Sequence, residues 1–278
     1  MSDVARTAVI TLARGRHEHL ARQQESLRQP GPAPLRVLVS LGDPDVGCDH
    51  DNLAGDAADA VVRLDVGPHD ALPLAAGRNA GAARALELGA TGLVFLDVDC
   101  LVGPRTVAAY AAALAQEPGT VWSGPVTYLR AEDRPYRLVD LERLDHPHPA
   151  RPAPATGERL VQDAWELFWS LSFAVSAPAW AAAGGFDEAY DGYGGEDTDF
   201  GQRARVAGLH LGWLGDARAY HQHHPTQNPP VQHLHDVLRN ARTFRARWGW
   251  WPMTGWLEAF ADQGLVHRDE ARDDWRLA

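Results

Sequence analysis

Three groups of residues have types and spacings that suit catalysis or metal binding. The first is Asp97-Val98-Asp99, which follows an apolar run. In an extended chain, residues two apart point to the same face, so these two carboxylates can share a divalent cation. Such a cation could neutralise the charge of a diphosphate. The other interpretation is a polar turn that ends a strand.

The second group is segment 192–200, which reads GYGGEDTDF. Glycines let the backbone pass close to a ligand. Glu196 and Asp197 follow them at the start of a predicted helix, where the helix dipole favours ionised carboxylates. An ionised carboxylate beside a hydroxyl is a suitable general base. The alternative is that Glu196 and Asp197 simply cap the helix.

The third group is segment 220–225, which reads YHQHHP. His221 and His223 lie two residues apart at the end of a short predicted strand, and His224 follows them. An imidazole here could bind a metal ion. The alternative is a polar turn that faces solvent.

The elements that must position these groups follow from the hydrophobic pattern. We predict strands over 7–13, 35–41, 60–66 and 92–98, and helices over 17–27, 75–89 and 104–116. This alternation predicts an α/β fold with a mainly parallel sheet and helices on both faces. Ligands of such sheets bind beyond the carboxyl ends of the strands, where Asp97 and Asp99 lie.

The rest of the chain is less regular. A helix is predicted from Glu196 and a strand over 209–214, and the chain looks mostly helical from Val231 on. Segment 146–158 is rich in Pro, Ala and His without an apolar period. We interpret it as a mobile loop, within a flap over 130–160 that closes on a ligand.

Composition excludes several kinds of protein. The chain has 278 residues and a formal net charge of −11, which argues against a nucleic-acid partner because phosphate binding needs an excess of Lys and Arg. The only cysteines are Cys48 and Cys100, so no disulfide framework is expected and a cytoplasmic location is the default. The amino terminus lacks a signal-peptide pattern. No run reaches the ~18 apolar residues of a transmembrane helix.

The three groups together resemble a known family. An Asp-x-Asp strand end, the segment GGFDEAYDGYGGEDTDFGQR (184–203) and a downstream histidine occur in this order in the GT-A glycosyltransferases. The chain resembles most the family 2 type and the C-terminal region shared by the galactosyltransferase and chondroitin-polymerase groups. The resemblance implies a GT-A domain over 1–230, with nucleotide binding in 1–125 and acceptor binding in 126–230. A helical C-terminal extension would cover 231–278.

The resemblance also implies roles for individual residues. Those that would line the nucleotide pocket are Thr11, Ala13, Arg14, Asp43, Arg78, Asn79, Asp97, Val98 and Asp99. Those that would bind the metal are Asp99 and His221, with Asp97 and His223 as further candidates; His224 is an alternative to His223. Asp197 would be the catalytic base, and Glu196 would hold the acceptor. Arg78 and Asn79 could instead form a polar face on an Ala-rich helix.

The activity implied by the resemblance is hexosyl transfer that depends on Mn²⁺ or Mg²⁺. The donor would be a nucleotide sugar, with UDP as the nucleotide, and the acceptor a carbohydrate or a glycosylated small molecule. A single displacement would invert the anomeric centre; a retaining mechanism is an alternative. A nucleotidyltransferase would be expected to have a G-x-G-T-R loop where this chain has Leu12-Ala13-Arg14-Gly15-Arg16. A catalytically silent carbohydrate-binding protein would be expected to lack the acidic residues.

Overall fold

The computed structural model describes residues 6–28, 32–48 and 58–278. Residues 1–5, on which the signal-peptide prediction partly rests, lie outside this part. In the first half the predicted elements are present, with ends that differ by a few residues. The strands are β1 (Thr7–Ala13), β2 (Leu35–Leu41), β3 (Ala60–Leu64) and β4 (Gly92–Leu96). The helices are α1 (His17–Ser26), α2 (Leu74–Glu87) and α3 (Thr106–Gln116).

The chain after β4 completes a mixed sheet and adds a smaller one. Its strands are β5 (Cys100–Val102), β6 (Thr120–Ser123), β7 (Val126–Tyr128), β8 (Arg159–Val161), β9 (Ser172–Ser176), β10 (His210–Leu214) and β11 (Ala219–His221). The large sheet has the order β3-β2-β1-β4-β9-β6-β10-β8. Its first four strands are parallel, and β9 is antiparallel to both of its neighbours. The small sheet has the order β5-β11-β7, and its strand β5 is the next strand after β4 in the chain.

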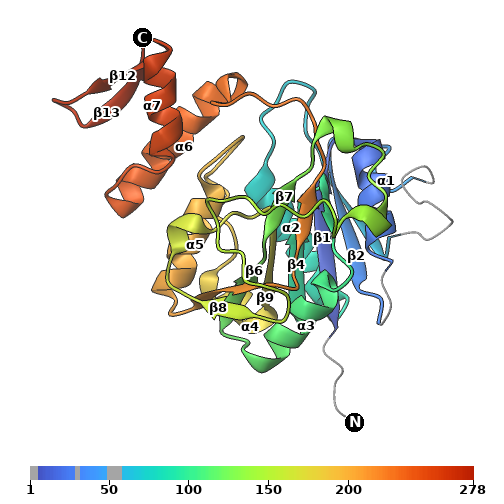
Figure 1. Ribbon diagram of the computed structural model, residues 1–278. Coiled ribbons are helices and arrows are strands. Elements are labelled where there is room, and N and C mark those ends of the chain that lie inside the picture. The colour runs from blue at the N-terminus through green and yellow to red at the C-terminus, as the bar shows by residue number, and fades with distance from the viewer. Residues whose placement is uncertain (1–5, 29–31, 49–57) are drawn as a thin grey trace.

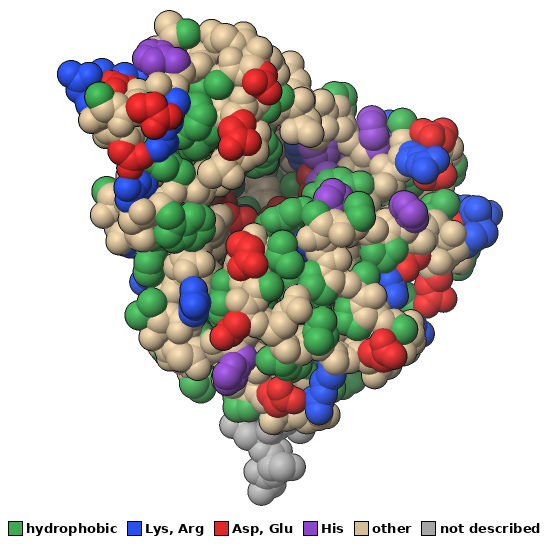
Figure 2. Space-filling model, turned by 60° about the vertical axis from the view of Figure 1, so that its left-hand side comes forward, with side chains coloured by type: hydrophobic (Ala, Val, Ile, Leu, Met, Phe, Trp, Pro, Cys, Tyr) green, Lys and Arg blue, Asp and Glu red, His purple; other side chains and the backbone are tan. Residues whose placement is uncertain are grey.

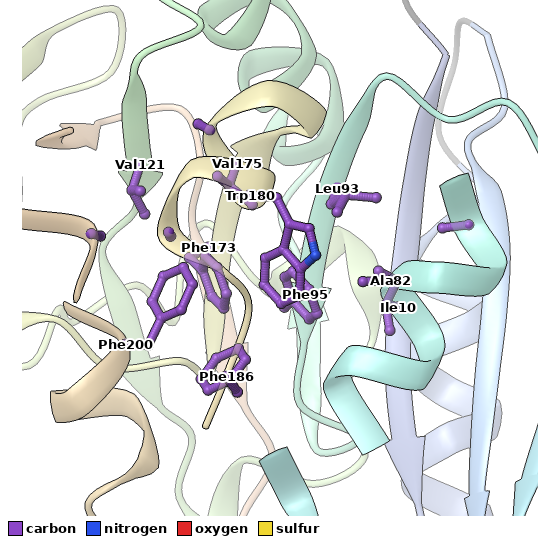
Figure 3. Close-up of a cluster of buried hydrophobic side chains, with 14 of the residues drawn as sticks. Ile10, Ala82, Leu93, Phe95, Val121, Phe173, Val175, Trp180, Phe186 and Phe200 are labelled. Carbon is purple, nitrogen blue, oxygen red and sulfur yellow. The ribbon is translucent and has the colours of Figure 1, made fainter. Parts of the chain in front are cut away.

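A cluster of aromatic side chains fixes the acidic helix against the large sheet. Helices α4 (Ala177–Ala183) and α5 (Glu196–Val206) contribute Trp180 and Phe200 to it (Figure 3). The ring centroids of Phe95 and Phe173 are 4.7 Å apart, as are those of Phe186 and Phe200. Each such side chain contributes about 1.5–3 kcal/mol when buried. The start of α5 is therefore held at a fixed place relative to β4.

The C-terminal region forms an appendage at one end of the molecule (Figure 1). It comprises α6 (Leu234–Trp248), α7 (Thr254–Asp262) and a hairpin of β12 (Val266–Asp269) and β13 (Asp274–Leu277). Val237, Leu257, Phe260, Val266 and Trp275 are buried together in a hydrophobic cluster of their own. The predicted helices are present, but the prediction of a helical extension did not include the hairpin.

The predicted mobile loop over 146–158 is joined to the body of the protein through Arg151. Arg151 is only 5% exposed, and its guanidinium lies 4.9 Å from the ring centre of Trp169 and 4.8 Å from that of Trp213. Its Nη2 donates to Ser123 Oγ at 2.6 Å. A Pro-rich composition does not reveal such an anchor, because a guanidinium can stack on aromatic rings inside a protein. The loop is therefore anchored at Arg151, and its mobility stays a prediction. Across the described residues, no helix combines the length and apolar character needed to cross a membrane.

Candidate active site

The turn between β4 and β5 carries Asp97, Val98 and Asp99. The amide of Cys100 donates to Asp97 O at 2.9 Å, and Gln23 Nε2 donates to the same oxygen at 2.6 Å. The turn is thus fixed from its own backbone and from α1. Asp99 is 8% exposed, whereas 44% of the Asp97 side chain remains accessible. The two carboxylates consequently have different surroundings despite their spacing.

Asp99, His221 and His224 form a group with the geometry of a metal site. One ligand atom from each lies within 4.8 Å of the others. His221 Nε2 is 3.3 Å from Asp99 Oδ1, and His224 Nε2 is 3.2 Å from Asp99 Oδ2. His223 is not part of the group, and its amide donates to Tyr136 OH at 3.3 Å. His224 therefore stands where His223 was predicted as the further histidine.

The protonation of this group suits a divalent cation. Burial opposes ionisation of Asp99, but the hydrogen bond from His224 and the charges of His221 and Arg16 hold its pKa below the usual value. Burial lowers the pKa of His221, which favours the neutral imidazole that a metal requires. Within the described chain, no hydrogen bond reaches the buried Asp99 Oδ1. One carboxylate and two imidazoles fit Mn²⁺, and less closely Mg²⁺, which prefers oxygen ligands.

Arg16 lies next to this group and was not predicted from the sequence. Its Nη1 donates to Asp99 Oδ2 at 2.9 Å, while Asp99 Oδ1 lies 3.3 Å from His221 Nε2. Arg16 occupies the residue before α1 with a positive φ of 54°. The only sequence signal for it was a basic residue three positions after the end of a predicted strand. Its position beside Asp99 gives the site a fixed positive charge.

Arg78 connects the metal-binding turn to the start of α5. Its Nη1 donates to Glu196 Oε1 at 3.0 Å, and its Nη2 to Asp97 Oδ1 at 3.5 Å. The Arg78 and Glu196 side chains are 6% and 8% exposed. Asp97 therefore faces Arg78 and is not in the group formed by Asp99 and the histidines. Burial raises the pKa of Asp97, Arg78 opposes this shift, and the charges of Asp99 and Glu196 add to it.

Asp197, the predicted base, is partly exposed at the first turn of α5. Its Oδ1 accepts from the Thr198 amide at 2.7 Å and from the Thr198 hydroxyl at 3.3 Å. Burial and the neighbouring charge of Glu196 raise the pKa of Asp197 to about 6, against the lowering effects of Arg78 and Thr198. The helix start alone was expected to keep this group ionised. With a pKa of about 6 the carboxyl is still mostly ionised at pH 7, as suits a general base.

Of the residues predicted to line the nucleotide pocket, some are buried in the core and others lie at or near a surface pocket. Thr11 and Ala13 are buried in the core, and the Thr11 hydroxyl donates to Gln23 Oε1 at 2.9 Å. Asp43 lies in a pocket of about 570 Å³ at the ends of β2 and β3. It accepts from the Gly15 amide at 2.6 Å, while Arg14 donates to Gly67 O at 2.8 Å. Only Asp43 among these residues lines the pocket itself.

Asn79 supports a loop. Its Nδ2 donates to Phe186 O at 2.9 Å and to Glu188 Oε1 at 2.8 Å, and its Oδ1 accepts from the Phe186 amide at 2.9 Å. Asp187, in the same loop, pairs with Arg247. These contacts join the loop 186–188 to α2 and to α6.

One face of the molecule is hollowed between the body and the C-terminal appendage. Figure 2 shows acidic side chains in this recess and histidines near its edge. The composition of the face matches the groups described above, with carboxylates beside imidazoles.

Comparisons with known proteins agree with the fold and with the motif region. A family model described as the N-terminal domain of galactosyltransferase matches residues 160–225, a span that includes the start of α5 and the three histidines. No curated protein sequence matches the chain.

Two solved structures show the same fold. The first is GalNAc-T7 with UDP, GalNAc and Mn²⁺, with a TM-score of 0.56 and 14% identity over 95% of this chain. This chain spans 58% of the GalNAc-T7 chain. The second is residues 1–349 of S. aureus TarS, with a TM-score of 0.58 and 13% identity over 91% of this chain and 74% of that one. The predicted GT-A fold and the resemblance to glycosyltransferases are thereby confirmed.

Proposed function

We propose that this chain transfers a sugar from a nucleotide-sugar donor to an acceptor hydroxyl, with the help of a divalent metal ion. The observation that carries the proposal is the Arg78 guanidinium, which contacts both Asp97 and Glu196. It joins a turn with a metal-ligand group to a helix start with a candidate base. These are the two parts that a metal-assisted displacement requires.

The donor side would be formed by Asp99, His221 and His224. These residues would hold Mn²⁺ or Mg²⁺, which, when bound, would act as a Lewis acid on the departing diphosphate. Arg16 would add a second positive charge beside Asp99. UDP and Mn²⁺ are present in the similar GalNAc-T7 structure, which supports a UDP sugar as donor. Asp43, in the pocket at the ends of β2 and β3, would lie near the nucleobase of the donor.

The acceptor side would be formed by the first turn of α5. Asp197, with a pKa of about 6, would take the proton of the attacking hydroxyl. Glu196 Oε1 is paired with Arg78, and no described residue bonds its buried Oε2. That oxygen would accept a hydrogen bond from a carbohydrate or a glycosylated small-molecule acceptor. A single displacement from this side would invert the anomeric centre.

Calorimetric titration of UDP in EDTA and in Mn²⁺ tests the metal requirement. We expect measurable affinity with Mn²⁺ and a large loss in EDTA, because the diphosphate otherwise meets a carboxylate-rich surface. Asp99→Ala should remove the effect of Mn²⁺. Thr243→Ala, whose hydroxyl donates to Arg239 O within helix α6, is a matched control. Equal affinity with and without metal would contradict the proposal.

A thermal-shift screen of nucleotide sugars would then identify the donor. A ligand at a hundred times its dissociation constant should stabilise the protein by about 2.7 kcal/mol. Slow release of nucleoside diphosphate from the stabilising donor would show turnover. A protein that only binds carbohydrate would not release it.

A further inference from the structure

Helix α6 of the C-terminal appendage lies directly against the glycine-rich segment before α5. Asn240 is fully buried there, and its Nδ2 donates to Gly194 O at 2.8 Å and to Asp191 O at 3.0 Å, with Tyr193 O at 3.4 Å. One amide group thus gathers three backbone carbonyls of the loop. Carbonyls that gather on one donor are held in a single arrangement, because each would otherwise need another partner.

The glycines of this segment make room for the C-terminal appendage. A Cβ at Gly192 would lie 2.3 Å from Asp236 Oδ2, and one at Gly194 would lie 2.8 Å from Met253 Sδ. Asp236 also accepts from the Tyr193 amide at 3.3 Å. The close approach therefore serves contact between two parts of this chain, whereas the sequence suggested contact with a ligand.

The far end of α6 holds the body of α5. Asp199 is completely buried, and its Oδ1 accepts from Arg247 Nη1 and from Trp248 Nε1, each at 2.8 Å. The Tyr190 hydroxyl donates to the same oxygen at 3.1 Å. Helix α6 consequently contacts the chain on both sides of Glu196 and Asp197.

We propose that α6 positions the acidic start of α5 for the reaction, with Asn240 as the positioning residue. The proposal rests on the proposed function, since it treats Asp197 as the base. Asn240 acts through the loop: it fixes residues 191–194, and these fix the direction in which α5 begins. A displacement of about 1 Å at a catalytic group is enough to lower a rate substantially. The C-terminal appendage is then required for catalysis, because its helix α6 positions the start of α5.

The test compares Asn240→Asp with Thr243→Ala. Asn240→Asp keeps the size of the side chain but replaces the donor with an acceptor that faces three carbonyls. Thr243 is on the same helix, and its hydroxyl donates to Arg239 O within that helix. Asp236→Ala is a second loop variant, which removes the acceptor of the Tyr193 amide should Asn240→Asp fail to fold.

Two measurements are made on each full-length variant. Hydrogen exchange of the amides in 191–198 should become about 10- to 100-fold faster in the loop variants, as expected when one or two hydrogen bonds are lost, and stay unchanged in Thr243→Ala. With a donor that wild type turns over, kcat for transfer or donor hydrolysis should fall by about tenfold in the loop variants, with the donor KM unchanged.

The outcomes separate the two proposals. Faster exchange with a lower kcat and an unchanged donor KM supports positioning by α6. Unchanged exchange in both loop variants, or faster exchange with wild-type kcat, would overturn it. A wild-type protein that turns over no nucleotide sugar contradicts the proposed function, and the exchange measurement still decides whether α6 holds the loop.

Discussion

The contact between Arg78 and Glu196 gives a quantitative prediction about stability. Arg78→Met keeps the length and apolar stem of the side chain but removes its charge. Glu196 Oε1 then loses its partner at 3.0 Å, and Oε2 already lacks a hydrogen bond from any described residue. The variant thus leaves a carboxylate that is 8% exposed without a counter-charge.

The size of the effect follows from this burial. Removing one member of a buried ion pair typically costs about 3–5 kcal/mol. The second contact of Arg78, to Asp97 at 3.5 Å, involves a side chain that is 44% exposed and should contribute little, because solvent screens such pairs. We therefore expect the free energy of unfolding to fall by about 3–5 kcal/mol in Arg78→Met.

A double-mutant cycle with Glu196→Gln separates the ion pair from other effects. Urea unfolding of wild type, both single variants and the double variant gives the coupling energy. In the double variant the unpaired charge is gone, so its loss of stability should be smaller than the sum of the single losses by on the order of 2 kcal/mol. Additive losses, or a loss below about 1 kcal/mol in Arg78→Met, would refute the reasoning.

Three further predictions concern the chemistry of the site. Asp197→Asn should lower the transfer rate by about 10²–10⁴-fold and change donor affinity little, and a near wild-type rate would place the base elsewhere. Because the pKa of Asp197 is raised to about 6, wild-type kcat should fall as pH drops below that value. A kcat that is flat across this range would contradict the assignment. In a Mn²⁺ titration His224→Ala should lose affinity and His223→Ala should not; the reverse result would restore His223 as the ligand.

The first half of the fold could be predicted because its signals are local. The segment GLVFL of β4 is a short, continuously apolar run, and all five of its residues are buried. The packed loop around Arg151 and the hairpin β12–β13 could not be found in this way. The burial of Arg151 depends on Trp169 and Trp213, which are distant in sequence. The hairpin strands VHRD and DWRL are short and mostly polar, so they give only a weak apolar pattern.

The histidine group shows why residues that lie two apart in the sequence need not share a face. His221 and His223 would share a face only if the chain stayed extended. Strand β11 ends at His221, and the next amide, that of Gln222, donates to Asp99 O at 2.7 Å. The chain then turns, so His224 comes to Asp99 and His223 comes to Tyr136. The residue types could be predicted from sequence, but their grouping depended on where one strand stops.

Arg78 and Asn79 show the corresponding limit for a helix. The resemblance implied that both residues line the nucleotide pocket. Neighbours on an α-helix point about 100° apart, because the helix has about 3.6 residues per turn. Arg78 accordingly contacts Asp97 and Glu196, while Asn79 bonds the loop at Phe186. Two adjacent side chains thus support two sides of the same site: the first links its carboxylates, and the second holds the loop that leads to α5.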